Sequence, residues 1–163
     1  MNGEHFDTVV CAGVSAVKWL ANKEPENDRA NITKLAATLA SIKAEKFILI
    51  STIDVYPFNQ YKDETFDCSD SSHHPYGKHR LEFEQFCNDT FEHCTIIRLP
   101  GLFGKGLKKN VIYDLINNNC LEMINPNSTI QYYDLSNLWD DIQISIQNEI
   151  DLINLFNENH ISH

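Results

Sequence analysis

Two short segments carry the side chains best suited to acid–base chemistry. The first runs from Ser51 to Tyr56 and places Thr52 directly after a run of apolar residues. In the second, Tyr76 and Arg80 are four residues apart. Residues with this spacing lie on one face of a helix, one turn from each other. A phenol beside a fixed cation, with a hydroxyl nearby, can exchange a proton with a hydroxyl or carbonyl group of a substrate.

Proton exchange by a tyrosine near neutral pH requires help from its surroundings. The ordinary pKa of a phenol is about 10, and a nearby positive charge lowers it by stabilising the phenolate. We therefore expect Arg80 to lower the pKa of Tyr76, and Thr52 to hold the reacting oxygen against the phenol. Each segment alone also fits an ordinary structural role at a strand end or a helix start. Their joint occurrence in this order favours a catalytic site.

The apolar pattern predicts the elements that would position these residues. Continuous apolar runs at residues 8–12, 47–50 and 95–99 are typical of strands buried on both faces of a parallel sheet. The polar and acidic residues 57–75 are expected to form a long loop. Helices are expected at about residues 25–42, 76–90, 111–118 and 136–148, and short further strands at 130–133 and 153–155.

This alternation predicts an α/β fold in a single domain, residues 1–163, with a parallel sheet of about three to five strands flanked by helices. In such sheets, ligands lie at the carboxyl ends of the strands, where Thr52 is expected. Right-handed crossovers that advance in one direction leave their helices on one face of the sheet. The opposite face is then only partly covered, which indicates a homo-oligomer, another partner or missing sequence, and we expect a homo-oligomer.

The composition disfavours several other classes of function. The chain has 163 residues, of which 42% are hydrophobic, and its 13 basic and 23 acidic residues give a net charge of −10. Such an acidic chain is a poor binder of nucleic-acid phosphates. The N-terminus lacks the basic and apolar regions of a signal peptide, and no apolar run approaches the length of about 20 residues that crosses a bilayer. We expect a cytoplasmic protein that binds neither nucleic acid nor membranes.

The cysteines and histidines lack the spacing of a metal site or a disulfide framework. The five cysteines are odd in number and contain no CxxC pair, so reduced thiols are expected. Cys11 lies in an apolar run and is expected to be a small core residue rather than a nucleophile. Four donors lie close together in sequence, but donors in a polar loop more often stay free, and we expect no metal there. These donors are Cys68, His73, His74 and His79.

Several segments, in the same order, resemble the extended short-chain dehydrogenase/reductase family of NAD(P)-dependent sugar-nucleotide epimerases, dehydratases and reductases. Residues 51–56 match its S-[ST]-x-x-V-Y segment, and Tyr76 matches the tyrosine of its YxxxK motif. Residues 98–104 resemble its R-x-x-x-[VL]-[YF]-G segment. Residues 8–13 match the strand whose end lines the cofactor site. The resemblance covers about residues 7–151.

The resemblance implies a Rossmann-like fold and specific residue roles. Thr52, Tyr76 and Arg80 would be catalytic, with hydride passing between a substrate carbon and a nicotinamide while Tyr76 exchanges the hydroxyl proton. NAD or NADP would be the cofactor, and a nucleotide sugar or a similar small molecule would be the substrate. The implied cofactor contacts lie at strand ends and at a helix start: Ala12, Gly13, Ser51, Tyr76, Arg80 and Pro100.

Two features depart from the family pattern. The lysine of the YxxxK motif is replaced by Arg80, which keeps the charge but is longer, planar and forked. The glycine-rich G-x-x-G-x-x-G turn that holds the pyrophosphate is absent, so the chain would correspond to the catalytic half of the fold, with the first βαβ units missing. Two functions stay open. One is an NAD(P)-dependent epimerase-, dehydratase- or reductase-like protein; the other is a non-catalytic, truncated or degenerate homologue serving as a dimerisation or assembly module.

Overall fold

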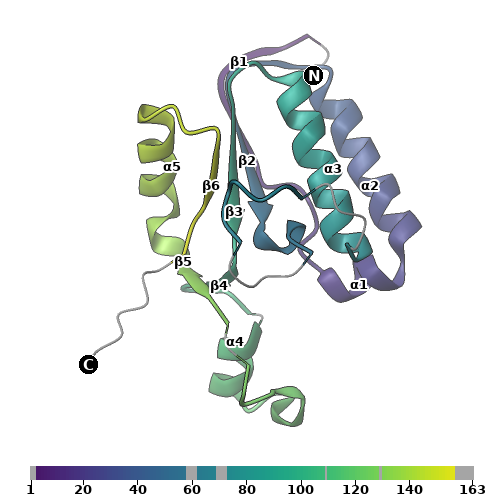
Figure 1. Cartoon of the computed structure of the whole chain (residues 1–163), viewed down its shortest axis with the longest axis vertical. Coiled ribbons are helices and arrows are strands. Elements are labelled where there is room, and N and C mark those ends of the chain that lie inside the picture. The colour runs from purple at the N-terminus through teal and green to yellow at the C-terminus, as the bar shows by residue number, and fades with distance from the viewer. Residues whose placement is uncertain (1–2, 58–61, 69–72, 109, 129, 157–163) are drawn as a thin grey trace.

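The computed structural model describes residues 3–57, 62–68, 73–108, 110–128 and 130–156. Within these ranges, the main sheet has four strands, all parallel, in the order β1-β2-β3-β6 (Figure 1). The strands are β1 (His5–Cys11), β2 (Lys43–Thr52), β3 (Cys94–Leu99) and β6 (Leu152–Asn154). The prediction of a parallel α/β sheet of three to five strands is therefore confirmed.

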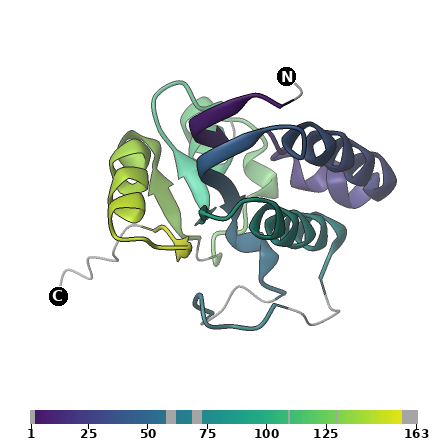
Figure 2. The ribbon, with the colours of Figure 1, turned by 90° about the horizontal axis from the view of Figure 1, so that it is seen from above.

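Helices cover the two faces of the sheet unequally (Figures 1 and 2). One face carries α1 (Lys18–Lys23), α2 (Pro25–Leu39) and α3 (Pro75–Thr90), and the other carries α5 (Leu138–Gln147). α5 packs beside β3 and leaves the β1 side of its face open. Val10 of β1, in register with Ile48, is accordingly 43% exposed. The structure thus has the partly covered face that the crossover pattern predicts.

A second, smaller sheet extends beyond the carboxyl ends of the main strands. It pairs β4 (Gly101–Phe103) with β5 (Tyr132–Asp134) in parallel, and α4 (Asn110–Asn117) lies below it in Figure 1. Pro100 with Gly101, Gly104 and Gly106 predicts a break in regular structure, and this prediction is wrong for Gly101, which begins β4. The Tyr132 ring packs so close to Gly101 that a Cβ there would lie 2.9 Å from it. Glycine therefore permits the strand pair rather than ending the structure.

Alternate residues of β2 supply both hydrophobic cores. Phe47 and Leu49 pack with Phe83 and Cys87 under α2 and α3, whereas Ile48 packs with the residues under α5. A strand covered on two faces must be apolar at successive positions, which is the pattern that the sequence shows. The cores also contain Cys11, 6% exposed, whose thiol pKa is raised by burial. The prediction that Cys11 is a core residue is confirmed.

Several boundaries differ from the predicted ones. α1 was not predicted, and the helix expected from residue 136 begins at Leu138, because Asp134 accepts a hydrogen bond from the Ser136 amide and starts a 3-10 turn first. Trp19 and Trp139, which the sequence predicts to pack or to lie at an interface, are 67% and 57% exposed. Parts of the predicted loop 57–75 lie outside the described residues; the described residues up to 74 hold only turns, bends and irregular chain, and Pro75 begins α3. None of the helices in the described ranges is long and apolar enough to cross a bilayer.

A buried ion pair fastens α3 to the sheet. The Arg98 guanidinium of β3 binds the Glu84 carboxylate of α3, with Nη2 and Oε2 2.6 Å apart, and both side chains are at most 6% exposed. Ser51 donates a hydrogen bond of 2.5 Å to the same carboxylate, and Arg98 donates to the Tyr56 hydroxyl at 2.9 Å. Because these charges are removed from water, each would be energetically costly to bury without its partner.

Glu84→Gln should therefore destabilise the fold strongly. The substitution leaves the Arg98 guanidinium buried without a counter-charge, which is expected to lower the free energy of unfolding by about 3–5 kcal/mol in urea unfolding experiments. Glu82→Gln is the matched control on the same helix, because Glu82 pairs with Arg29 at 2.8 Å in a largely exposed position. The control should lose at most about 1 kcal/mol. Equal losses in the two variants would contradict the structural role of the buried pair.

Candidate active site

The carboxyl edge of the sheet brings the Thr52 hydroxyl to the Tyr76 phenol. Thr52 is the last residue of β2, and Tyr76 is the second residue of α3 and only 6% exposed. The Thr52 hydroxyl lies near enough to the phenol to act on its pKa, in the lowering direction. Thr52 Oγ1 also accepts a hydrogen bond of 3.1 Å from the Asp54 amide, which fixes the hydroxyl at the start of the following turn. The structure therefore brings together two of the residues that the sequence singled out.

Close backbone contact holds Tyr76 at this edge. The turn η1 (Ile53–Val55) follows β2 directly, and a Cβ on Gly77 would overlap the Asp54 carbonyl oxygen. Only glycine lets the start of α3 approach this turn so closely. The Tyr76 amide, one of the unpaired amides at the helix start, donates to Asn22 Oδ1 at 2.9 Å. These contacts fix the backbone of Tyr76 and thereby the position of its phenol.

Arg80 lies flat against the Tyr76 ring, with its guanidinium carbon 3.9 Å from the ring centroid. The side chain is 3% exposed and forms a two-pronged ion pair with Asp28 of α2, in which Nη2 donates to Oδ1 at 2.9 Å and Nη1 donates to Oδ2. His79 Nδ1 lies 2.8 Å from Asp28 Oδ2. Burial alone would raise the pKa of Asp28, but Arg80 and His79 together lower it. The cation beside the phenol is thus paired within the fold.

The net electrostatic effect on Tyr76 differs from the expected one. Burial raises the pKa of Tyr76 above its ordinary value, and the Asp54 charge acts in the same direction. Arg80 lowers the pKa, as the sequence predicted, but it does not outweigh burial. The phenol is therefore protonated at neutral pH, and it can donate a hydrogen bond or a proton to a ligand oxygen.

The residues expected to contact the cofactor fall into two groups. Ala12 and Gly13 follow β1 and are exposed, and Pro100 follows β3 and is half-buried, so all three lie at the carboxyl edge. Ser51 and Arg80 instead have polar partners inside the protein, at Glu84 and Asp28. Their polar atoms are already used by the fold.

The dinucleotide implied by the family does not fit the described residues as a whole. Its pyrophosphate needs free amides at a helix start, without negative charge nearby. α2, the longer of the two helices that follow β1, begins with Pro25 and has Glu26 and Asp28 in its first turn. The first turn of α3 is occupied by His74, whose Nδ1 accepts a hydrogen bond of 3.1 Å from the Gly77 amide. Only the edge near Tyr76 offers suitable groups, and these suit a substrate oxygen.

A cleft of about 710 Å³ adjoins this edge. Its lining is mostly apolar and comes from one segment: Ala16, Val17, Lys18, Trp19 and Asn22. Asn22 binds the Tyr76 amide, and Lys18 Nζ lies 2.6 Å from Asp54 Oδ1, so the wall of the cleft is tied to the turn that carries Thr52 and to α3. Apolar clefts with a few polar groups are the usual form of small-molecule sites.

Sequence reasoning missed Asp28 as a part of this site. In the sequence, Asp28 lies with Glu24 and Glu26 around Pro25, a pattern that predicts only the start of a helix. It lies four residues before Ile32, on the same side as Leu35 and Leu39, so it belongs to the buried stripe of α2. A charge on an apolar stripe needs a buried partner, and this was the available signal. The partner could not be identified from the sequence, because Arg80 is 52 positions away.

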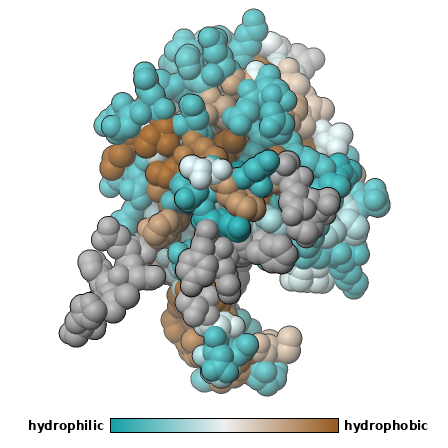
Figure 3. Space-filling model, viewed as in Figure 1, coloured by the Kyte–Doolittle hydropathy of each residue, from teal (hydrophilic) through white to brown (hydrophobic). Residues whose placement is uncertain are grey.

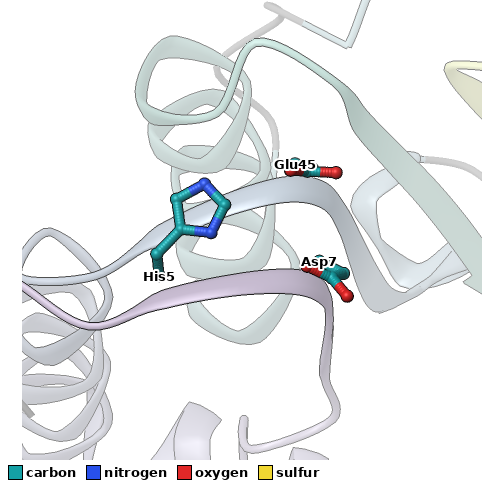
Figure 4. A group of neighbouring side chains, drawn as sticks. All are labelled: His5, Asp7 and Glu45. Carbon is teal, nitrogen blue, oxygen red and sulfur yellow. The ribbon is translucent and has the colours of Figure 1, made fainter.

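The donors considered for a metal site have separate partners. His73 Nε2 donates to the Val55 carbonyl oxygen at 2.6 Å, His74 caps α3, and His79 binds Asp28. A different group lies near the amino ends of β1 and β2, where donor atoms of three side chains are within 4.8 Å of one another (Figure 4). These side chains are His5, Asp7 and Glu45. All three are exposed and lie at the end of the strands opposite to Thr52, so they form no part of the candidate active site.

Comparison with known proteins identifies the family. Residues 1–140 match the NAD dependent epimerase/dehydratase family, and the chain belongs to this family. The resemblance inferred from the motifs is therefore confirmed. No curated protein matches the sequence.

Solved structures show the same fold in longer proteins. An epimerase from Methanothermobacter thermautotrophicus is 20% identical with a TM-score of 0.71, over 92% of this chain and 51% of that one. A dTDP-4-dehydrorhamnose reductase from Clostridium acetobutylicum is 19% identical with a TM-score of 0.72, over 94% and 56%. A dTDP-glucose 4,6-dehydratase from Bacillus anthracis, solved with NAD, is 12% identical with a TM-score of 0.62, over 94% and 52%. The chain thus spans about half the length of these relatives.

The cap on α3 predicts a pH dependence of stability. Burial lowers the pKa of His74, with Lys18 and His73 acting in the same direction and Asp54 in the opposite one. Unfolded His74 takes up a proton near pH 6.5, whereas folded His74 does so only at lower pH. The contribution of His74 is therefore complete above this pH and is lost as the pH falls below it.

His74→Asn tests this dependence, because asparagine caps helices but does not titrate. Urea unfolding of both proteins at about pH 7.5 and pH 5.5 should show that the parent loses more stability than His74→Asn at the lower pH. The other histidines contribute equally to both proteins. If the two proteins lose the same free energy, His74 is not capping α3 as a neutral side chain.

Proposed function

We propose that the chain supplies the substrate-binding and proton-transfer part of an NAD(P)-dependent sugar-nucleotide epimerase, dehydratase or reductase. The observation that carries this proposal is the contact between Thr52 and Tyr76 at the carboxyl edge of the sheet. Membership of the epimerase/dehydratase family supports a nicotinamide cofactor. The solved relatives described as acting on dTDP sugars support a nucleotide sugar as the substrate class.

Each residue has a definite task in this proposal. Tyr76, protonated at neutral pH, donates to the reacting oxygen and exchanges a proton with it. Thr52 gives a second hydrogen bond to the same oxygen, and the cleft beside Trp19 and Val17 accepts the apolar parts of the substrate. Arg80 acts from within the fold, through the Tyr76 ring. Residues 1–163 would form one domain, equivalent to the catalytic half of the longer fold, and the pyrophosphate would be bound by groups beyond those described.

A second candidate is a non-catalytic module for dimerisation or assembly. Two observations favour it: the cation beside Tyr76 is paired with Asp28, and α2 begins with acidic residues where a pyrophosphate needs amides. Both features weaken cofactor binding by the chain alone. The two candidates differ in one measurable property, the binding of nicotinamide cofactor.

Cofactor binding and the Tyr76→Phe variant together separate the candidates. NADH and NADPH, titrated by fluorescence and calorimetry, are expected to bind weakly, in the millimolar range, because the part of the chain that the structure describes holds no phosphate cradle. With a nucleotide sugar such as UDP-glucose, Tyr76→Phe should lower turnover about 10²–10⁴-fold, since it removes the exchanged proton, and leave cofactor affinity nearly unchanged. Tyr132→Phe, on the separate β4-β5 sheet, is the control and should keep full turnover. Absence of cofactor binding at several millimolar would favour the non-catalytic candidate.

Self-association is the expected use of the open apolar surfaces. Figure 3 shows apolar side chains gathered over α5 and on α4, and residues of both helices are exposed, including Ile144 at 53% and Ile116 at 75%. The face of β1 that holds Val10 is open as well. Light scattering should therefore give a mass of at least twice 18.7 kDa. A stable monomer at all concentrations would rule out this use.

A further inference from the structure

The ion pair between Asp28 and Arg80 lies against the Tyr76 ring and bears on the protonation state in which this phenol meets a ligand. We propose that Asp28 is a positioning residue for Tyr76: it holds the Arg80 guanidinium flat on the phenol ring and balances its charge, so that Tyr76 meets its ligand as a neutral hydrogen-bond donor suited to a carbonyl oxygen. The choice of ligand rests on the proposed function of Tyr76. We call the Asp28–Arg80 ion pair, held against the Tyr76 ring, the clamp; it is a property of the folded chain and needs no ligand.

The hydrogen bonds of Arg80 fix its position. Nη1 donates to Asp28 Oδ2 and, at 3.4 Å, to the Tyr76 carbonyl oxygen. Nη2 donates to Asp28 Oδ1 at 2.9 Å and to the Ser15 carbonyl oxygen at 2.6 Å. The remaining donor, Nε, is buried and has no partner among the described residues. With both Nη atoms bound to α2 and to the chain after β1, the guanidinium cannot turn towards a ligand without breaking a buried ion pair.

The same geometry determines the charge that reaches the phenol. Arg80 faces Tyr76 from α3, Asp54 faces it from η1, and the Thr52 hydroxyl faces it from β2. Asp28 of α2 forms an ion pair with Arg80 and also contacts His79. A cation paired this closely acts on a third group as a dipole, whose field falls off faster than that of a single charge. Burial then dominates, and the pKa of Tyr76 is raised.

A neutral phenol and an ionised one select different ligands. The neutral phenol is a donor, and when a ligand binds, the Thr52 hydroxyl can turn from the phenol to the ligand, so that a carbonyl oxygen with two lone pairs accepts both. A phenolate, which an unpaired cation would favour, is an acceptor and binds an alcohol through its O–H. The clamp therefore favours the keto form of a sugar over its alcohol form at neutral pH.

Titration of the Tyr76 phenol tests the clamp without any ligand. Tyrosine labelled with ¹³C at Cζ gives six resonances, and Tyr76→Phe identifies the one to follow. Asp28→Asn should leave Arg80 unbalanced and lower the Tyr76 midpoint by about one pH unit or more. The double variant Asp28→Asn/Arg80→Met removes both charges, and its midpoint should return to within about half a unit of the parent's. Glu82→Gln, which breaks the exposed ion pair between the same two helices, should not move it.

An unchanged midpoint in Asp28→Asn would overturn the proposal, and so would a fall that the double variant does not reverse. If near-ultraviolet circular dichroism shows that Asp28→Asn does not fold, the double variant decides alone. A midpoint near the parent's then supports balanced charges, whereas a rise of about one unit or more shows that Arg80 acts as an unpaired cation and overturns the proposal. Because the titration uses neither cofactor nor substrate, its failure is distinguishable from failure of the proposed function.

Discussion

Burial of charge on one helix is the constraint on which the site depends. α3 carries Arg80 and Glu84 four residues apart, and each is at most 3% exposed. Each needs a partner from another element, and Asp28 of α2 and Arg98 of β3 supply them. The two ion pairs fix α3 against a neighbouring helix and against the sheet. Tyr76, at the start of α3, is consequently placed by charges whose separation would leave an unpaired ion in a dry interior.

The two departures from the family pattern are connected by this arrangement. An ammonium is a compact charge that can serve a ligand directly, whereas a guanidinium suits a two-pronged bond to a carboxylate. Arg80 makes that bond with Asp28 in the first turn of α2, where a phosphate-binding helix would instead keep its amides free. The same buried carboxylate thus occupies the cation at the phenol and opposes phosphate at the helix start. The proposed proton-transfer groups are thus in place, while the charged groups beside them are turned inward.

Much of the fold could be predicted because it depends on local patterns. The run from Phe47 to Ile50 identified a strand covered on both faces, and the four-residue spacing of Tyr76 and Arg80 identified one face of α3. The pairing of Gly101 with Tyr132 could not be predicted, because 31 positions separate the two residues and nothing in either segment marks its partner. Glycine signals a break and a close contact equally well in a sequence.

The candidate site was predictable in its members but not in its electrostatics. Order and spacing were enough to select Thr52 and Tyr76, since both positions follow from where a parallel strand ends and a helix begins. The sign of the pKa shift of Tyr76 depends on two further quantities, the burial of the phenol and the pairing of Arg80, and both are tertiary. A cation at the right spacing shows that a charge is near. Its effect on the phenol also depends on burial, which is the largest cause of the raised pKa here, and, in the arrangement we propose, on the Asp28 carboxylate that pairs with the cation.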